Sequence, residues 1–458
     1  MLAPQRPPSP ARKGGYMQRL SMFIASCLMC GFSVAAFAGD AEFQPKISSS
    51  GVIGWEMGQI VKGRYQNATY DHIWFGTNVA SANLKTILTE HLSLQAGIEA
   101  RIWFNTFPLE RMVEYTAGSD RYASFDLKEA QGIYSFLSGE TLKLEIALGI
   151  MPYRYNPTVT DLGEYLFRTG TYPAYIITRF DATSATVSGL RIGARYSRGA
   201  FGAKADLLVL SESEIRPFHD GTIAGIFGAD IFNVMDIGGG VSFAHLIPVD
   251  NRSTTPQIPD ASYEISPGDT GFYTFAGTKL MAHATIDPLF FMRGSKFGKL
   301  LGQGGKIYGE IAILGLKDYP KAIANPWGYD TLSQKFPKMF GITLPIPVLF
   351  DVLALEFEHY SCPYPNDYSQ VFQKGWPVPL PGVMATGDYN MSTYRHDDWK
   401  WSLYAKKQLG RHFELVGQIG RDHQRWEAHI AHMRNYDFED ALIKPDEWAW
   451  HLKAQFKY

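Results

Sequence analysis

Cysteine is nearly absent from this sequence. Only three cysteines occur in 458 residues, and two of them, Cys27 and Cys30, lie in an apolar stretch near the N-terminus. If that stretch is removed on export, Cys362 remains alone and cannot form an internal disulfide. Neither a Cys-x-x-Cys pair nor a Cys/His cluster with zinc-ligand spacing is then left. The fold therefore depends on backbone pairing and packing, not on covalent or metal cross-links.

Long apolar runs are also scarce. After residue 38 no run reaches the roughly 20 apolar residues of a transmembrane helix. The longest candidate, residues 341–355, is interrupted by Pro345, Pro347 and Asp351. A helical membrane protein is thereby excluded.

Excess charge of one sign is missing as well. The formal net charge is −2, and for residues 39–458 it is −6, because residues 1–38 contain four basic residues and no acidic one. Such a chain lacks the basic surface that binds nucleic acid, so no nucleic-acid partner is expected.

The N-terminus has the features of a secretory signal peptide. Basic residues precede the apolar stretch 20–38, and residues 36–38 form the small-x-small pattern that signal peptidase accepts. We predict cleavage after Ala38 and a single exported domain over residues 39–458. A transmembrane anchor would need a longer, less interrupted run. The lipoprotein-like box at 24–27 has too little apolar sequence before it.

Alternation of apolar and polar residues is abundant. In residues 448–458 the apolar residues fall on one side of an extended chain and the polar residues on the other, the period of a half-buried strand. About sixteen such segments (roughly 14–18) are expected. They lie near 48–62, 72–88, 91–104, 121–137, 141–153, 184–197, 200–211, 221–232, 237–249, 271–287, 306–317, 338–345, 350–361, 396–407, 412–424 and 448–458.

The connections between these segments alternate in length. Short connections such as 198–199 and 408–411 mostly follow every second strand, whereas long ones such as 154–183 and 362–395 mostly follow the others; the exception is 288–305, a long connection at a position where a short one is expected. A soluble β-sandwich is the alternative, but its Greek-key connections give no reason to keep the long loops at one end. The pattern is typical of an all-β transmembrane antiparallel barrel with short periplasmic turns and long extracellular loops.

Together the signal peptide, the alternating strands and the aromatic residues Phe456 and Tyr458 resemble a bacterial outer-membrane β-barrel protein, porin-like and of an uncharacterised family. Residues 149–173 and 336–360 are similar to segments of such barrels. The resemblance implies the outer membrane of a Gram-negative bacterium and contact with its lipid. It also implies that Phe456 and Tyr458 are the signal recognised by the barrel-assembly machinery.

The residues facing the lumen would determine selectivity. The alternation directs Leu94, Ile98 and Ile102 toward lipid. The predicted pore-lining residues are Gln95, Glu99, Arg101, Lys143, Glu145 and Arg191. Carboxylates and guanidinium groups facing each other across a narrow passage would select solutes by charge. In the alternative interpretation they pair with each other as ordinary wetted lumen residues.

The connection 154–183 is predicted to be functional, because long loops with apolar content of their own seldom act as spacers. It mixes aromatic residues with Asp161, Glu164 and Arg168. Either it folds inward, so that these charged residues constrict the pore, or it forms an extracellular cap.

Catalytic motifs are missing: neither G-x-S-x-G, nor H-E-x-x-H, nor a phosphate-binding glycine loop occurs. We expect no enzymatic activity, no catalytic residue and no cofactor. Histidines and carboxylates at 396–398 and 421–432 suggest a metal site only weakly, and solvated loops explain them better. The aromatic residues of 362–395 leave an extracellular glycan open as a partner.

The expected function is a porin-like channel for passive diffusion of small polar solutes. Its mixed lumen charges argue against strong selection of anions or cations. The alternative is a structural or surface-binding barrel with an occluded lumen, such as an adhesin or glycan receptor. An outer-membrane hydrolase would need a Ser/His/carboxylate set at the rim, which the sequence does not show.

Overall fold

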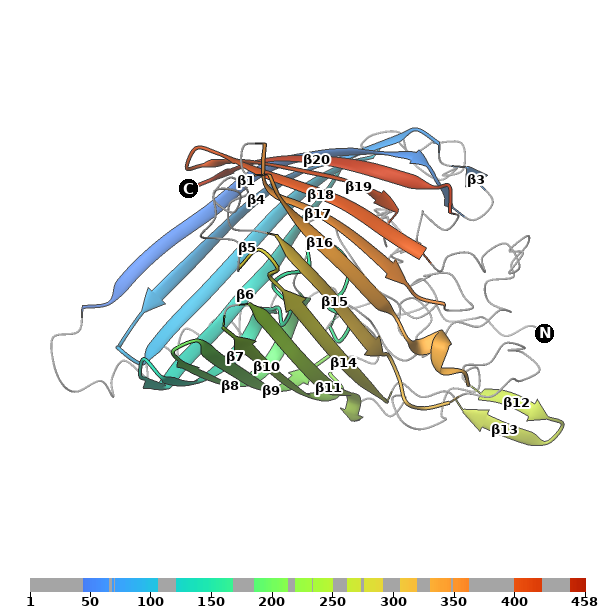
Figure 1. Ribbon diagram of the computed structural model, residues 1–458, viewed down its shortest axis with the longest axis horizontal. Coiled ribbons are helices and arrows are strands. Elements are labelled where there is room, and N and C mark those ends of the chain that lie inside the picture. The colour runs from blue at the N-terminus through green and yellow to red at the C-terminus, as the bar shows by residue number, and fades with distance from the viewer. Residues whose placement is uncertain are drawn as a thin grey trace, which may run out of the picture.

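Sixteen strands form one closed antiparallel barrel (Figure 1). The structure is a computed structural model. It describes residues 44–65, 68–69, 71–105, 121–167, 185–212, 219–232, 234–249, 262–272, 276–290, 305–318, 330–346, 349–361, 399–421 and 445–458. The all-β barrel expected from the sequence, with its even number of strands, is confirmed.

Each barrel strand pairs with its neighbours in the sequence, and β1 pairs with β20 to close the barrel. The strands are β1 (Lys46–Lys62), β4 (Ile73–Ile87), β5 (Leu92–Asn105), β6 (Arg121–Ser138), β7 (Leu142–Tyr153), β8 (Ala185–Arg198), β9 (Phe201–Ser211), β10 (Gly221–Ile231), β11 (Met235–Ile247), β14 (Gly277–Ile286), β15 (Lys306–Ile313), β16 (Lys338–Ile346), β17 (Phe350–His359), β18 (Trp399–Leu409), β19 (Phe413–Arg421) and β20 (Trp448–Lys457). Every predicted segment corresponds to one of them.

The largest difference in bounds concerns the predicted strand 271–287, which begins only at Gly277. Residues 271–272 belong instead to a separate hairpin of β12 (Ser262–Ser266) and β13 (Asp269–Phe272). Gly268 turns this hairpin with φ +86°, a conformation that glycine adopts without strain. In Figure 1 the hairpin projects away from the barrel wall.

Two further small elements lie outside the barrel sheet: a minimal hairpin of β2 (Arg64–Tyr65) and β3 (Ala68–Thr69), and the 3-10 helix η4 (Leu332–Lys335). Among the described residues, no helix is both long enough and apolar enough to span a bilayer.

The short turns gather at one end of the barrel. Lys46 pairs with Ile87 next to the β4–β5 turn, and Lys457 pairs with Val52 at the same end. Gly199 and Gly410 turn two of these hairpins with φ +62° and +69°. We call this the short-turn end, and the opposite end the long-loop end.

The outer face of the barrel is apolar. Leu94, Ile98 and Ile102 are 37%, 40% and 42% exposed, and they alternate with less exposed polar residues along β5. The alternation places Leu94, Ile98 and Ile102 on the outer face of β5. Aromatic pairs lie near both ends, as in the girdles of transmembrane barrels. They are Trp74–Trp450 and His359–Trp399 toward the long loops, and Tyr134–Phe136 and His412–Phe456 toward the short turns.

Candidate functional site: a segment seated across the barrel interior

Residues 154–167, which follow β7, run inside the barrel; we call them the interior segment. Val159, Leu162 and Glu164 are each 0% exposed. Hydrogen bonds connect the segment to inward-facing residues of β9, β15, β17 and β19, which lie on different sides of the wall. The first half of the predicted loop 154–183 is therefore an internal element, whereas residues 168–183 are outside the described part of the chain.

Two glutamates of the barrel wall anchor the interior segment through their carboxylates, and we call them its seats. Glu356 of β17 is the first. Its carboxylate accepts hydrogen bonds from the backbone N–H groups of Thr160 (2.6 Å), Asp161 (2.9 Å) and Leu162 (2.7 Å). The Tyr308 hydroxyl donates a further bond of 2.7 Å and orients the carboxylate. Several N–H donors converging on one carboxylate give strong, charge-assisted hydrogen bonds.

Glu310 of β15 forms a second seat. It accepts hydrogen bonds from the N–H groups of Glu164 (3.1 Å) and Tyr165 (2.9 Å) and from the Tyr155 hydroxyl (2.6 Å). Burial raises the pKa of the Tyr155 phenol well above its ordinary value, and the Glu310 carboxylate raises it further. The phenol therefore stays protonated and remains a donor.

Contacts near the start of the segment (its root, at Tyr155) and at its turn (its tip, at Asp161) show how far it extends across the barrel. At the root, Lys204 Nζ of β9 donates to the carbonyl oxygen of Tyr155 over 3.0 Å. At the tip, Gln418 Nε2 of β19 donates to Asp161 over 2.8 Å. Because β9 and β19 are far apart in the strand order, the segment crosses the interior.

Two residues of the interior segment have left-handed backbones. Gly163 has φ +93° and Glu164 has φ +62°. The turn allows the Glu164 carboxylate to accept hydrogen bonds from the N–H groups of Tyr155 (3.3 Å) and Asn156 (2.5 Å). The segment is thus closed on itself as well as attached to the wall.

An apolar cluster fills the space between the segment and the wall. Leu162 and Leu166 belong to a cluster with Leu208, Ile226 and Met281. Burial of such side chains stabilises by about 1.5–3 kcal/mol each. The fit is close at Gly240 of β11, where a Cβ atom would lie 2.8 Å from Leu166 Cδ1. The segment is therefore packed against the barrel wall as tightly as a small hydrophobic core.

Two of the predicted pore-lining residues, Glu145 of β7 and Arg191 of β8, pair with each other. Arg191 lies 2.5 Å from Glu145 and 3.3 Å from Asp206. Tyr153 donates a hydrogen bond of 3.0 Å to Asp206. Lys143, the other predicted residue on β7, is exposed near the short-turn end.

The predicted residues on β5 also lie within a polar cluster. Glu99 forms an ion pair with Arg101 and lies 3.2 Å from Lys128 of β6. Lys128 sits at a bulge, because Gly97 pairs with Glu129 while Ile98 pairs with Leu127. The extra residue points two successive side chains, at 128 and 129, into the lumen.

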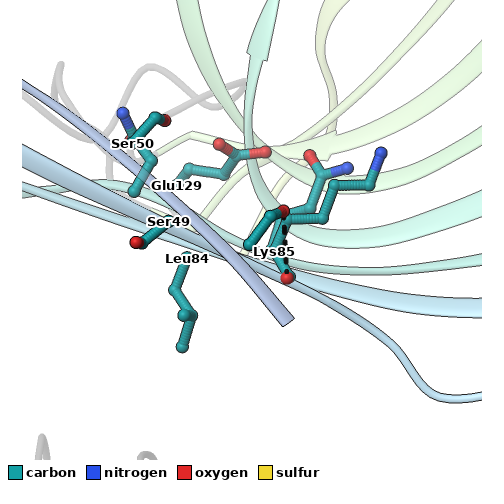
Figure 2. Close-up of a pocket in the computed structure, with 8 residues that line it drawn as sticks. Ser49, Ser50, Leu84, Lys85 and Glu129 are labelled. Atoms are coloured by element: carbon teal, nitrogen blue, oxygen red, sulfur yellow. Dashed lines mark hydrogen bonds between the residues drawn. The ribbon is translucent and has the colours of Figure 1, made fainter. Parts of the chain in front are cut away.

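An open pocket of about 530 Å³ lies on this wall near the short-turn end. It is lined by Ser48, Ser49, Ser50, Asn83, Leu84, Lys85, Gln95 and Glu129. Figure 2 shows Leu84 and Glu129 directed to opposite sides of the wall. Because the inward-facing lining residues of this pocket are polar, this part of the barrel interior is hydrophilic.

Sequence reasoning did not single out the seats Glu310 and Glu356. On a barrel strand an inward glutamate resembles any other lumen residue, and the donors in the interior segment that these two glutamates accept from lie 145 or more residues away in the sequence. A usable signal was the sequence LALEFEHY, which places Glu356 and Glu358 on one face of a strand without a cation between them. Glu358 indeed accepts a hydrogen bond of 2.8 Å from the Tyr165 hydroxyl.

Several predicted site residues lie outside the described residues: Arg168, the loop 362–395, the cluster 396–398, and 422–432. Within the described ranges no group of three or more His, Cys, Asp or Glu side chains is arranged to hold a metal ion.

No family model and no curated protein sequence matches this chain. Solved structures of a porin are similar. A triple mutant of the Rhodopseudomonas blastica porin shares 8% identity, covers 90% of this chain and 100% of its own, and has a TM-score of 0.38. A double mutant of the same porin gives 8% identity, the same coverage and a TM-score of 0.39. At these TM-scores the likeness carries no argument about function.

Proposed function

We propose that the chain is a porin-like channel of a Gram-negative outer membrane, through which small polar solutes diffuse past the interior segment. The observation that supports it best is a closed barrel of sixteen strands with an apolar exterior and a charged interior. A barrel of this size is wide enough for an aqueous lumen. The signal peptide 1–38 and the assembly role of Phe456 and Tyr458 belong to the same proposal.

In this proposal the interior segment sets the upper size limit of the solutes that can pass through the barrel. It crosses the lumen between β9 and β19 and is held by Glu310 and Glu356, so it takes up part of the cross-section. Solutes would pass along the wall of β4–β6, where Gln95, Glu99 and Arg101 face the interior. Paired charges there favour polar solutes over apolar ones.

A barrel with an occluded lumen is the second candidate, because part of the inner wall is fully covered. Ala354, Ser402 and Ala449, on β17, β18 and β20, are each 0% exposed. In that case the barrel would serve as a structural or surface-binding element, and an extracellular glycan would be its ligand.

Liposome swelling separates the two candidates. Vesicles containing the purified full chain are diluted into isotonic solutions of neutral sugars of increasing size. The channel predicts fast swelling with the smallest sugars and a steep decline with size, because the segment narrows the passage. Vesicles without protein are the control. Swelling no faster than in this control would contradict the channel and leave the occluded barrel.

A further inference from the structure

Three cations face one another on the inner wall near the short-turn end. The strand register places Lys143 of β7 opposite Arg195 of β8, and Arg195 opposite Lys204 of β9. We call these residues the cationic row. Lys143 shares its strand face with the buried Met151 and Tyr153, so the row belongs to the lumen side. Like charges directly opposite each other repel, so nearby carboxylates would be expected to neutralise them.

Two carboxylates beside the row, on β7 and β9, pair with Arg191. Glu145 and Asp206 lie on either side of Gly193, one step toward the long-loop end. The Arg191 guanidinium takes up the space at Gly193, 2.5 Å from Glu145 and 3.3 Å from Asp206. A Cβ at 193 would lie 2.9 Å from Asp206 Oδ1, so glycine makes this arrangement possible. Arg195 approaches Asp206 only to 3.9 Å.

The row is accessible from the lumen. Lys143 is exposed, and 46% of the Arg195 side chain is exposed. Within the described part of the chain Lys143 forms no ion pair. Lys204 is partly buried and bonds to the Tyr155 carbonyl oxygen, and Asp236 interacts with it electrostatically from β11. The exposed pair Lys143 and Arg195 therefore carries most of the available positive charge.

We propose that Lys143 and Arg195, supported by Lys204, form a binding site for small oxyanions at the short-turn mouth of the channel. A guanidinium fork and an adjacent ammonium are the groups that hold phosphate and carboxylate oxygens. The inference rests on the proposed channel function and deepens it, because it makes small anions the preferred solutes. The even balance of charge in the sequence conceals the site. On the inner faces of β7, β8 and β9, four cations (Lys143, Arg191, Arg195 and Lys204) lie beside only two carboxylates, Glu145 and Asp206.

Ion selectivity in a planar phosphatidylcholine bilayer tests the proposal. The full chain is measured under a potassium chloride gradient at low ionic strength, where the reversal potential gives the chloride-to-potassium permeability ratio. The wild type is expected to prefer chloride, and a Lys143→Gln/Arg195→Gln variant to lose most of that preference. Each charge removed about 8 Å from the ion path lowers the local anion concentration roughly twofold.

A matched control removes the same charges from the opposite face of the wall. Lys338 and Arg198 are exposed and lie at positions of the outward face of β16 and β8. The Lys338→Gln/Arg198→Gln variant should keep the wild-type reversal potential. Heat-modifiable migration on gels checks that both variants fold. Inorganic phosphate added at the short-turn side should reduce the chloride current of the wild type and of the control, but not that of the Lys143/Arg195 variant.

The possible outcomes distinguish failure of the oxyanion-site proposal from failure of the channel proposal. A conducting wild type without chloride preference, or a Lys143/Arg195 variant that keeps it, would overturn the oxyanion site and leave the channel standing. Equal reduction of all currents by phosphate would also overturn the site. Electrical silence of the folded wild type would instead contradict the channel itself.

Discussion

Glu356 shows how a single buried charge can hold a backbone in place. It accepts four hydrogen bonds from residues 160–162, three from N–H groups and one from the Thr160 hydroxyl. Hydrogen bonds to a charged group contribute about 1.5–3 kcal/mol each, and donors left without a partner are costly. A carboxylate at 356 therefore does more than line the lumen.

Replacing Glu356 with alanine should release the tip of the interior segment without unfolding the barrel. A reporter cysteine at Val159, which is 0% exposed, is introduced after Cys362 is changed to serine. Its labelling by a water-soluble maleimide should be slow in the parent and much faster with Glu356→Ala. Glu414→Ala is the control, because Glu414 bonds Gln455 and Lys457 on the same wall. Equal labelling rates in all three proteins would contradict the role of Glu356.

At the scale of elements, most of the barrel could be predicted from the sequence. Alternation of apolar and polar residues reports which face of a strand meets lipid, and this information is local. The start of β14 and the β12–β13 hairpin were harder to predict, since a hairpin outside the barrel alternates in the same way as one inside it. The bulge at Lys128 adds a residue without a visible break in the pattern.

The seats of the interior segment could not be predicted for a different reason. Contacts such as Asp161 with Gln418 or Tyr155 with Glu310 join residues that are 257 and 155 positions apart. Their formation depends on closure of the barrel, which places distant strands around one lumen. Asp161 and Glu164 were recognised as candidates, but only the assembled wall identifies what they contact.

The register of β5 gives a direct test at this scale. Ile98 is near the middle of the strand and 40% exposed on the outer face, so Ile98→Lys places a charge in the hydrocarbon region. The substitution should lower the free energy of unfolding in lipid vesicles by roughly 2–4 kcal/mol. Gln95→Lys, on the lumen face, should change it little. A reversed order of the two effects, measured by urea titration, would refute the register.

At the scale of the whole molecule, the first strand, β1, pairs with the last strand, β20, and this pairing closes the barrel. Val52 pairs with Lys457 and Ile53 with Phe456, and Gly51 and Tyr458 exchange backbone hydrogen bonds of 3.1 Å. The Tyr458 ring lies over Gly51, where a Cβ would come within 2.3 Å of it. Closure pairs both edge strands of the barrel sheet, which would otherwise be open to aggregation.

Deleting Phe456–Tyr458 should therefore prevent assembly. The deletion removes the last pairs of β20 with β1 and with Phe413 of β19. We expect the truncated protein to be degraded or aggregated before it reaches the membrane. Lys457→Ala, which keeps the backbone pairing, should assemble normally. Heat-modifiable migration and surface display of the truncation equal to those of the wild type would count against this role.

The central claim is that an aqueous passage runs through the barrel and is narrowed by the interior segment. Single-channel conductance in a planar bilayer measures this directly, with the intact chain compared to a variant whose residues 158–166 are replaced by a short Gly-Ser linker. The account predicts discrete openings for the intact chain and larger ones for the variant, with both barrels folded. Electrical silence of both folded proteins would contradict it.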